Sequence, residues 1–296
     1  MIRPLLLTLF LEAAMVIAWS SGFIGGKLSA ATPGVFLVLF WRFFLAALAL
    51  APFVVLAIRR GMTARQFVDQ AIVGLLALLV YLAAGLKAIE LGVPLGLAAL
   101  IAALQPLATA ALAGPLLGER AGGRQWLGLA LGFVGVALAV GGTADTAPTW
   151  AYGLCLLGMI GLVLATLFAK AREDSTAVLP ALGIQSAVAT LGFLVLTLAE
   201  GQLRPPMTAD FALAVLWFIV FSTLGGYGLY WICLKRSTAT RVASLIYLTP
   251  PVTMIWAWAM FDEALTAAGL AGFALCLLGV ALARQRPAAP AGCPQT

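Results

Sequence analysis

Few residues in this chain could carry out covalent chemistry. The 296 residues include no His, so neither imidazole catalysis nor an imidazole metal site is encoded. The four Cys are scattered, without the spacing of a metal site or a disulfide framework. The segment Gly25-Gly26-Lys27-Leu28 is not a phosphate-binding loop, because Leu stands where that motif requires Ser or Thr. We therefore expect no catalytic residue, no metal, no cofactor and no ATP hydrolysis.

Two charged residues lie inside long apolar stretches, Glu12 and Arg42. Ionisable groups at membrane depth are costly and are by default candidates for function. We expect Glu12 and Arg42 to be coupling residues or fixed charges of a cavity. The alternative for Glu12 is an acid that reaches the membrane surface or forms a structural pair. Lys87 and Glu90, three residues apart, are expected to form an ion pair at the rim of a span.

Two prolines fall near the middle of apolar runs, Pro106 and Pro250, each directly after a polar residue, Gln105 and Thr249. A proline inside a helix donates no hydrogen bond and displaces the carbonyl four residues earlier. In lipid such a carbonyl must be buried in protein or face a wet cavity. The pattern predicts two helix kinks that line a central cavity, although a kink satisfied by neighbouring helices would look the same.

Aromatic and hydroxyl side chains extend this polar set. Tyr247 lies three residues from Ser244 and two from Thr249, and other Trp, Tyr and Ser residues lie deep in their runs. We expect a substrate-binding set, with interfacial belts and ordinary core packing as the alternative for each aromatic residue. The set is Trp19, Ser20, Tyr81, Gln105, Tyr230, Ser244, Tyr247 and Thr249.

The composition indicates where these residues lie. Hydrophobic residues make up 63% of the chain and charged residues 9%, with a mean hydropathy of +1.09. This excludes a soluble enzyme, a nucleic-acid-binding module and a disordered protein. A membrane-spanning helix needs about 20 mostly apolar residues. We predict an all-α membrane protein with ten transmembrane helices, near 5–27, 34–58, 70–90, 95–117, 125–142, 149–169, 178–199, 211–234, 240–261 and 265–283.

The distribution of cations orients these helices. With the N-terminus in the cytoplasm, thirteen of the 17 Lys and Arg residues fall in inner segments. Cytoplasmic loops carry such an excess. Ten spans place both termini in the cytoplasm, and the Ala- and Pro-rich segment 287–296 is expected to be a disordered tail.

An internal repeat appears when the sequence is shifted by 144 residues. Matched pairs are Pro106 with Pro250, Glu119 with Glu263, Gly128 with Gly272, and the run 135–139 with 279–283. Each half contains five spans, an odd number, so the second half must cross the membrane in the opposite sense. Such inverted repeats are typical of secondary transporters. We predict halves at 1–144 and 145–286, packed through small residues that include Gly128, Gly132 and Gly135.

Several motifs of the chain resemble a known family. They are Trp19-Ser20-Ser21-Gly22-Phe23, Trp41-Arg42-Phe43, Gln105-Pro106 and Leu117-Gly118-Glu119-Arg120. As a set they resemble the EamA-type branch of the drug/metabolite transporter superfamily, and most closely its YddG-type amino acid exporters. The resemblance implies ten helices in two five-helix repeats and export of small metabolites from the bacterial cytoplasm, across the inner membrane.

The leading functional hypothesis is a secondary exporter of aromatic or neutral amino acids that works by alternating access. A cavity of hydroxyls, an amide, carbonyls and aromatic rings would suit a zwitterion. It would also suit purines, sugars or cationic drugs, and a passive pore and a membrane enzyme are further alternatives. The expected partners are a small-molecule substrate and the lipid bilayer, with no nucleic acid. The oligomeric state stays open, and a monomer would suffice.

Overall fold

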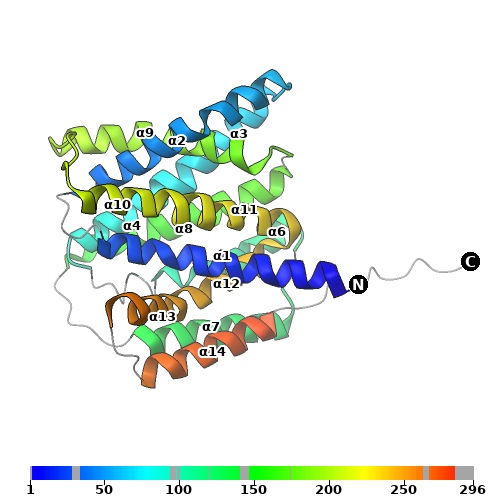
Figure 1. The fold of residues 1–296 in the computed structure, drawn as a ribbon. Helices are drawn as coiled ribbons and strands as arrows, with labels where there is room; N and C mark the ends of the chain where they lie inside the picture. The colour runs from blue at the N-terminus through cyan, green and yellow to red at the C-terminus, as the bar shows by residue number, and fades with distance from the viewer. Residues whose placement is uncertain are drawn as a thin grey trace, which may run out of the picture.

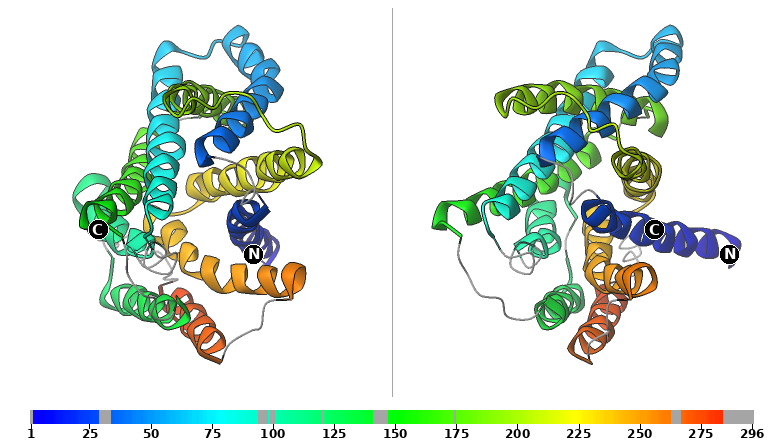
Figure 2. Two further views of the ribbon diagram at one scale, coloured as in Figure 1. Left: turned by 90° about the vertical axis from the view of Figure 1, so that its left-hand side faces the viewer. Right: turned by 60° about the vertical axis from the view of Figure 1, so that its left-hand side comes forward.

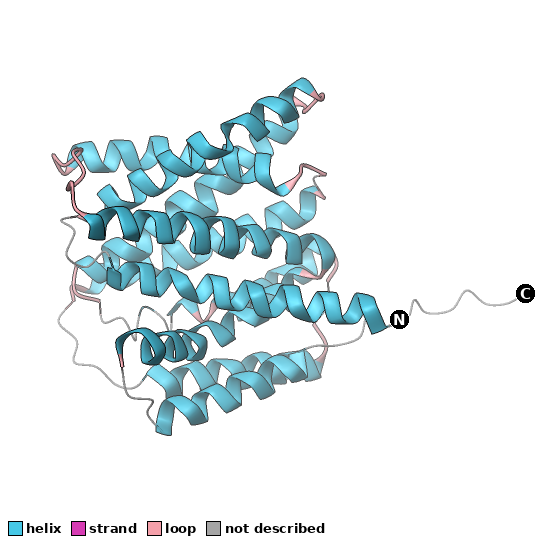
Figure 3. Cartoon of the chain, in the orientation of Figure 1, coloured by secondary structure: helices cyan, strands magenta, loops and turns pink. Residues whose placement is uncertain are grey.

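A computed structural model describes residues 2–28, 34–93, 98, 101–119, 121–140, 147–173, 175–262 and 267–283. Within these ranges every regular element is a helix and no strand occurs (Figure 3). The predicted tail 287–296 and the repeat partner Glu263 lie outside the described residues. The described helices overlap the apolar runs expected from the sequence, with α3 beginning at Ala64, six residues before the expected run, so the all-α architecture is confirmed for this part of the chain.

Helices of the first half follow the predicted runs closely. The segments α3, η1 and α4 form one continuous helix, in which η1 is a π-helical stretch. The elements are α1 (Ile2–Leu28), α2 (Val35–Arg59), α3 (Ala64–Gly74), η1 (Leu75–Val80), α4 (Tyr81–Glu90), α6 (Gln105–Leu117) and α7 (Gly123–Val140).

The second half contains the same kinds of element in the same order. The π-helical stretch η2 lies inside its third long helix, and a short 3-10 segment, η3, precedes Thr249. The elements are α8 (Thr149–Arg172), α9 (Val178–Ala199), α10 (Ala209–Trp217), η2 (Phe218–Tyr227), α11 (Gly228–Arg236), α12 (Ala239–Leu245), η3 (Ile246–Leu248), α13 (Thr249–Phe261) and α14 (Ala267–Ala283).

Many large apolar side chains lie on the outside of the bundle, in addition to its apolar core. Phe10, Leu191 and Val195 are each about two-thirds exposed, whereas Thr166, Thr197 and many other polar residues are fully buried. Within the described residues, six helical segments are long and apolar enough to cross a membrane, and α1, α7 and α14 contain shorter apolar stretches. The exposed apolar surface and the buried polar groups fit helices whose solvent is lipid, because unsatisfied polar groups are costly in contact with lipid.

Loops gather at two opposite ends of the bundle (Figure 1). At one end, which we call the basic end, the Gln66 amide nitrogen donates to Ser175, and Lys235 donates to the carbonyl of Thr176. This end also carries the charged helix termini at Arg59, Lys170, Arg172, Lys235 and Arg236. At the other, the distal end, Lys87 pairs with Glu90 and Glu200, each 3.1 Å away. The predicted Lys87–Glu90 pair is therefore confirmed, with Glu200 as an additional partner.

Pro106 starts a helix, whereas Pro250 lies within a helical segment that continues from Ala239 through a 3-10 turn. The chain forms a turn at Ala103–Leu104, and α6 begins directly after it, which places Pro106 in the first helical turn. Pro250 follows the 3-10 segment η3 at the start of α13. The expectation of a bend inside a continuous helix is thus corrected for Pro106, while at Pro250 the helix is locally tightened to a 3-10 turn. A proline fits the first turn of a helix because its missing N–H would have no partner there.

Glycines allow α7 and α14 to cross at backbone contact, side by side in Figure 2. A Cβ added at Gly128 would lie 2.5 Å from the carbonyl oxygen of Gly279, and one added at Gly135 would lie 2.8 Å from that of Gly272. Under the 144-residue shift, Gly128 corresponds to Gly272 and Gly135 to Gly279. The two contacts are therefore exchanged by the repeat, as in an interface with two-fold symmetry. The predicted packing through small residues is confirmed here.

Candidate functional site

A cavity of about 190 Å³ lies between helices of both halves, and we call it the central cavity. Its residues come from α1, α2, α4, α8 and η2, with Ala98 and Ala102 from the segment before α6, and they reach towards the distal end as far as Val35 and Ile89. The lining is mostly apolar. The side chains with polar or aromatic groups are Trp19, Arg42, Tyr81, Phe218, Ser222 and Tyr227.

Arg42 is the charged residue among the described residues that line this cavity, and only 2% of its surface is exposed. Its Nε donates to Thr223 Oγ1 and its Nη2 to Ser222 Oγ, both at 2.9 Å. The guanidinium also lies 4.6 Å from the ring centre of Phe43 and 4.9 Å from that of Phe218. These neutral partners orient the group but leave its positive charge uncompensated.

A layer of aromatic side chains closes the central cavity towards the basic end. The ring of Trp19 lies 4.9 Å from that of Tyr227 and 5.0 Å from that of Tyr230, and Tyr230 lies 5.1 Å from Trp231. The Tyr227 hydroxyl donates to the carbonyl of Ala77 at 3.0 Å. Because Tyr227 belongs to η2 and Ala77 to η1, this bond ties together the π-helical segments of the two halves.

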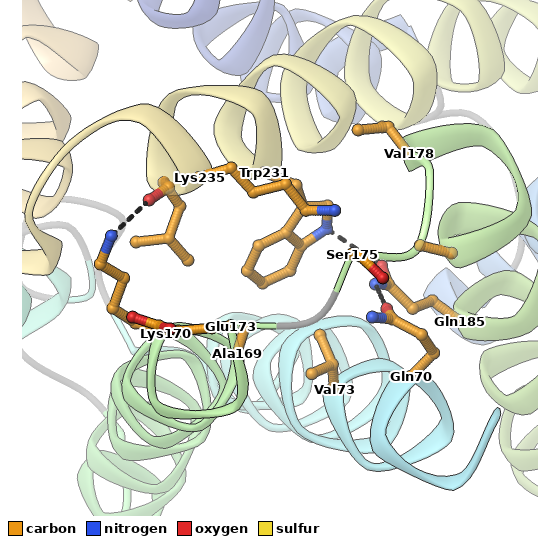
Figure 4. A pocket seen from close by; sticks show the side chains of 12 residues that line it. Gln70, Val73, Ala169, Lys170, Glu173, Ser175, Val178, Gln185, Trp231 and Lys235 are labelled. Atoms are coloured by element: carbon orange, nitrogen blue, oxygen red, sulfur yellow. Dashed lines mark hydrogen bonds between the residues drawn. The ribbon is translucent and has the colours of Figure 1, made fainter. Parts of the chain in front are cut away.

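A second cavity, of about 330 Å³, lies near the basic end, and we call it the basic-end cavity (Figure 4). The Trp231 indole donates to Gln185 Oε1 at 3.0 Å, and the Gln185 amide donates to Gln70 Oε1 at 2.7 Å. Lys170 and Lys235 stand at its edge, where Lys170 Nζ donates to the carbonyl of Leu234. Trp231 thus belongs to the aromatic layer and also borders the basic-end cavity.

Two carboxylates hold α12 against the first half at the basic end. Glu12 Oε1 lies 2.8 Å from both Nε and Nη2 of Arg241. The side chain of Glu119 accepts hydrogen bonds from the backbone N–H groups of Ala239 and Thr240. These are the first N–H groups of α12, which lack partners within the helix. We call this pair of contacts the α12 latch.

The structure places three of the expected site residues, Trp19, Arg42 and Tyr81, around the central cavity. Glu12 lies in the α12 latch, far along α1 from Trp19. Tyr230 lies in the aromatic layer, where its hydroxyl is 2.6 Å from that of Thr166.

The other expected residues lie in the packed region around the proline-led helix starts. Ser20 donates to the carbonyls of Val16 and Thr249, and Ser244 donates to the carbonyl of Arg241. Several of these groups are buried without a hydrogen-bond partner among the described residues, and none of them borders either cavity. These groups are Gln105 Nε2, the Tyr247 hydroxyl and Thr249 Oγ1.

Sequence reasoning missed several residues of the two cavities. Ser222 and Thr223, which orient Arg42, form a polar pair in an otherwise apolar run. Gln70 and Gln185, which form the amide pair of the basic-end cavity, are likewise isolated polar residues. Isolated polar side chains at membrane depth were the available signal. Among the described residues, no group of three His, Cys, Asp or Glu side chains could hold a metal ion.

Long apolar helices, glycine-packed crossings and a cavity between the two halves define a multi-pass membrane transporter. The EamA-like transporter family matches the chain twice, over residues 6–141 and again over residues 149–285. The chain therefore belongs to this family, and the internal repeat is confirmed.

Individual relatives agree with this assignment. A probable amino-acid metabolite efflux pump of Salmonella typhimurium is 28% identical over 204 residues, which cover 65% of this chain and 68% of that protein. The uncharacterized inner membrane transporter YedA of Escherichia coli is 24% identical over 244 residues, covering 80% and 79% of the two chains. A solved crystal structure matches 93% of this chain and 96% of its own with a TM-score of 0.75 at 18% identity, which shows a shared fold.

Proposed function

We propose that this protein is a secondary exporter of amino acids, aromatic and neutral ones above all, in the bacterial inner membrane. The central cavity carries the proposal, because it sets one buried guanidinium among aromatic walls at the junction of the two halves. Such a cavity offers a positive group to a carboxylate and ring surfaces to an apolar side chain. The relative named as a probable amino-acid metabolite efflux pump supports this substrate class.

The proposal includes the topology predicted from the sequence. Ten spans form two inverted halves, 1–144 and 145–286, with both termini in the cytoplasm. The family match to each half supports the repeat, and the contacts between α7 and α14, exchanged by the 144-residue shift, support two-fold symmetry between the halves. The excess of cations at the basic end supports a cytoplasmic location for that end. The central cavity then faces outward, and the aromatic layer and the α12 latch close the inner side.

The proposal includes transport by alternating access. To load substrate from the cytoplasm, the aromatic layer must separate and α12 must move away from Glu12 and Glu119. We propose Glu12 as the coupling residue, since protonation of its carboxylate would remove the charge that pairs with Arg241. Arg42 is the fixed charge of the cavity. Ser20, Gln105, Tyr230, Ser244, Tyr247 and Thr249 stay proposed substrate contacts, reached once the aromatic layer opens.

Uptake into proteoliposomes tests this function. The purified protein is reconstituted, and a panel of labelled amino acids, purines, sugars and cationic drugs is supplied with and without a pH gradient. Saturable transport of aromatic amino acids, lost in Trp19→Ala and kept in the lipid-exposed control Trp150→Ala, supports the proposal. If no amino acid moves, the substrate assignment is wrong. Unsaturable flux of many solutes would instead favour a passive pore.

A further inference from the structure

The charges around the central cavity are unbalanced. Arg42 is buried, and no carboxylate occurs among the described residues that line the cavity with it. The buried acids of the described chain are engaged elsewhere: Glu12 with Arg241, and Asp69 with Arg65 and Arg172. A cation at membrane depth without a counter-ion is costly. The cavity therefore offers a positive charge to an incoming anion, and its described lining offers no negative charge to a cation.

The guanidinium has donors left for such an anion. Its hydrogen bonds to Thr223 and Ser222 use Nε and one proton of Nη2, out of five N–H donors. The Nη1 group makes no hydrogen bond to any described residue. Nη1 and Nη2 together form the fork that binds the two oxygens of a carboxylate. The hydroxyls and the rings of Phe43 and Phe218 already hold the guanidinium in place. Binding of an anion should therefore cost little further conformational entropy of the Arg42 side chain.

The rest of the cavity selects what is attached to the carboxylate. Trp19, Tyr81 and Tyr227 supply ring surfaces, and most of the remaining lining is aliphatic. The volume of about 190 Å³ is below the range of about 300–1,000 Å³ that is usual for drug-sized ligands. The ammonium group of an amino acid would find no carboxylate among the described residues that line this cavity.

We infer that the central cavity recognises small monocarboxylates with an aromatic or branched apolar group, and that an α-ammonium group is not required. Arg42 is the specificity-determining residue, and amines without a carboxylate are excluded. This deepens the proposed function and rests on it, since it takes the central cavity as the substrate site. It also separates the amino acid hypothesis from cationic drugs, which share the aromatic requirement but would face the Arg42 charge.

Three ligands that share the same phenyl group and differ in their charged groups test this directly. Phenylalanine has a carboxylate and an ammonium group, 3-phenylpropanoate has only the carboxylate, and phenethylamine has only the ammonium group. Their binding to the purified protein in nanodiscs is measured by calorimetry, and transport is measured separately in proteoliposomes. We expect phenylalanine and 3-phenylpropanoate to bind within about tenfold of each other, because the ammonium adds little, and phenethylamine not to bind.

Variants then assign the effect to one residue. Arg42→Gln is expected to weaken 3-phenylpropanoate binding at least about tenfold, and Arg42→Lys by less, because it keeps the charge but loses the fork. Lys87→Gln is the matched control, since Lys87 is also a cation but is already paired with two carboxylates at the distal end. It should leave the order of the three ligands unchanged. The comparison of the three ligands uses the unmodified protein, so it remains valid even if a variant fails to fold.

The outcomes separate this inference from the proposed function. Preferential binding of phenethylamine, or unchanged 3-phenylpropanoate binding in Arg42→Gln, overturns the inference even if phenylalanine is exported. Absence of binding by all three ligands overturns it as well, and export of other amino acids then decides the function. If the carboxylates bind through Arg42 but no amino acid is transported, the inference stands and the proposed amino acid export is wrong.

Discussion

Removal of the Glu12 charge should open the basic end. Glu12 is almost fully buried and contacts Arg241 through one carboxylate oxygen, 2.8 Å from Nε and from Nη2. The two residues lie 229 positions apart, on α1 of the first half and α12 of the second. Opening of the basic end must break this contact. The substitution Glu12→Gln keeps the size and an acceptor oxygen but removes the charge.

The structure sets the size of the effect. A hydrogen bond to a charged group contributes about 1.5–3 kcal/mol. Because the Arg241 side chain is 25% exposed and so partly screened by water, we take the lower part of this range, about 1.5–2 kcal/mol. Since 1.4 kcal/mol is a factor of ten, the population open at the basic end should rise about 10- to 30-fold.

Native cysteines report on this change. Cys233 is buried near the basic end, Cys155 lines the central cavity, and Cys276 is fully buried between α7 and α14. With Cys293 replaced by Ser, labelling by a small thiol reagent should become about 10- to 30-fold faster at Cys233 in Glu12→Gln. Cys155 should be labelled more slowly and Cys276 should stay unreactive, because only access to the two ends changes.

The matched control removes a carboxylate from the exposed ion pair at the distal end. Glu90→Gln should leave the labelling of Cys233 unchanged, since Glu90 does not contact α12. An unchanged Cys233 rate in Glu12→Gln would refute the role assigned to the α12 latch. Faster labelling of all three cysteines would instead indicate general unfolding.

Three stability predictions follow from packing, each measured as the thermal unfolding of the purified protein. Gly128→Ala should cost about 1–3 kcal/mol, because its Cβ would meet the backbone of Gly279, whereas Gly153→Ala, with nothing within 4 Å, should be neutral or stabilise by up to about 1 kcal/mol; equal effects would contradict the close helix crossing. Tyr247→Phe should stabilise by about 1 kcal/mol, because the buried hydroxyl has no described partner, and a loss of stability would reveal one. Lys87→Ala should cost no more than about 1 kcal/mol, since its ion pairs are partly exposed, and a larger loss would show that they close the distal end.

Most of the fold could be predicted from the sequence. The length of each apolar run is a local property, the excess of cations is a sum over loops, and the repeat is visible by comparing the two halves of the sequence. Close packing of α7 against another helix could be predicted from Gly128, Gly132 and Gly135. A stripe of small residues on a helix in lipid allows the backbone of a neighbouring helix to approach closely. The π-helical segments η1 and η2 were not. Their hydrogen-bond pattern depends on packing between the halves, and no residue type marks it. The sequence placed Pro106 and Pro250 inside continuous α-helical spans near 95–117 and 240–261, and therefore missed the turn before α6 and the 3-10 segment before α13.

The site was predicted only in part. Trp19, Arg42 and Tyr81 could be selected from their depth alone, and they do share one cavity. Contacts between the two halves could not be predicted from the sequence. The pairs Glu12–Arg241 and Arg42–Thr223 each join residues about 200 positions apart. A repeat of 144 residues predicts which helices correspond but not which side chains meet, because equivalent positions carry different residues.

Counterflow tests the central claim most directly: one cavity with Arg42 at its wall opens alternately to the two ends. Proteoliposomes are loaded with unlabelled phenylalanine and diluted into a trace of labelled phenylalanine. We predict transient accumulation of label above its equilibrium level, abolished in Arg42→Gln and kept in Lys87→Gln, because exchange needs a binding site that faces each side in turn. A monotonic approach to equilibrium, equal in all three proteins, would contradict the claim.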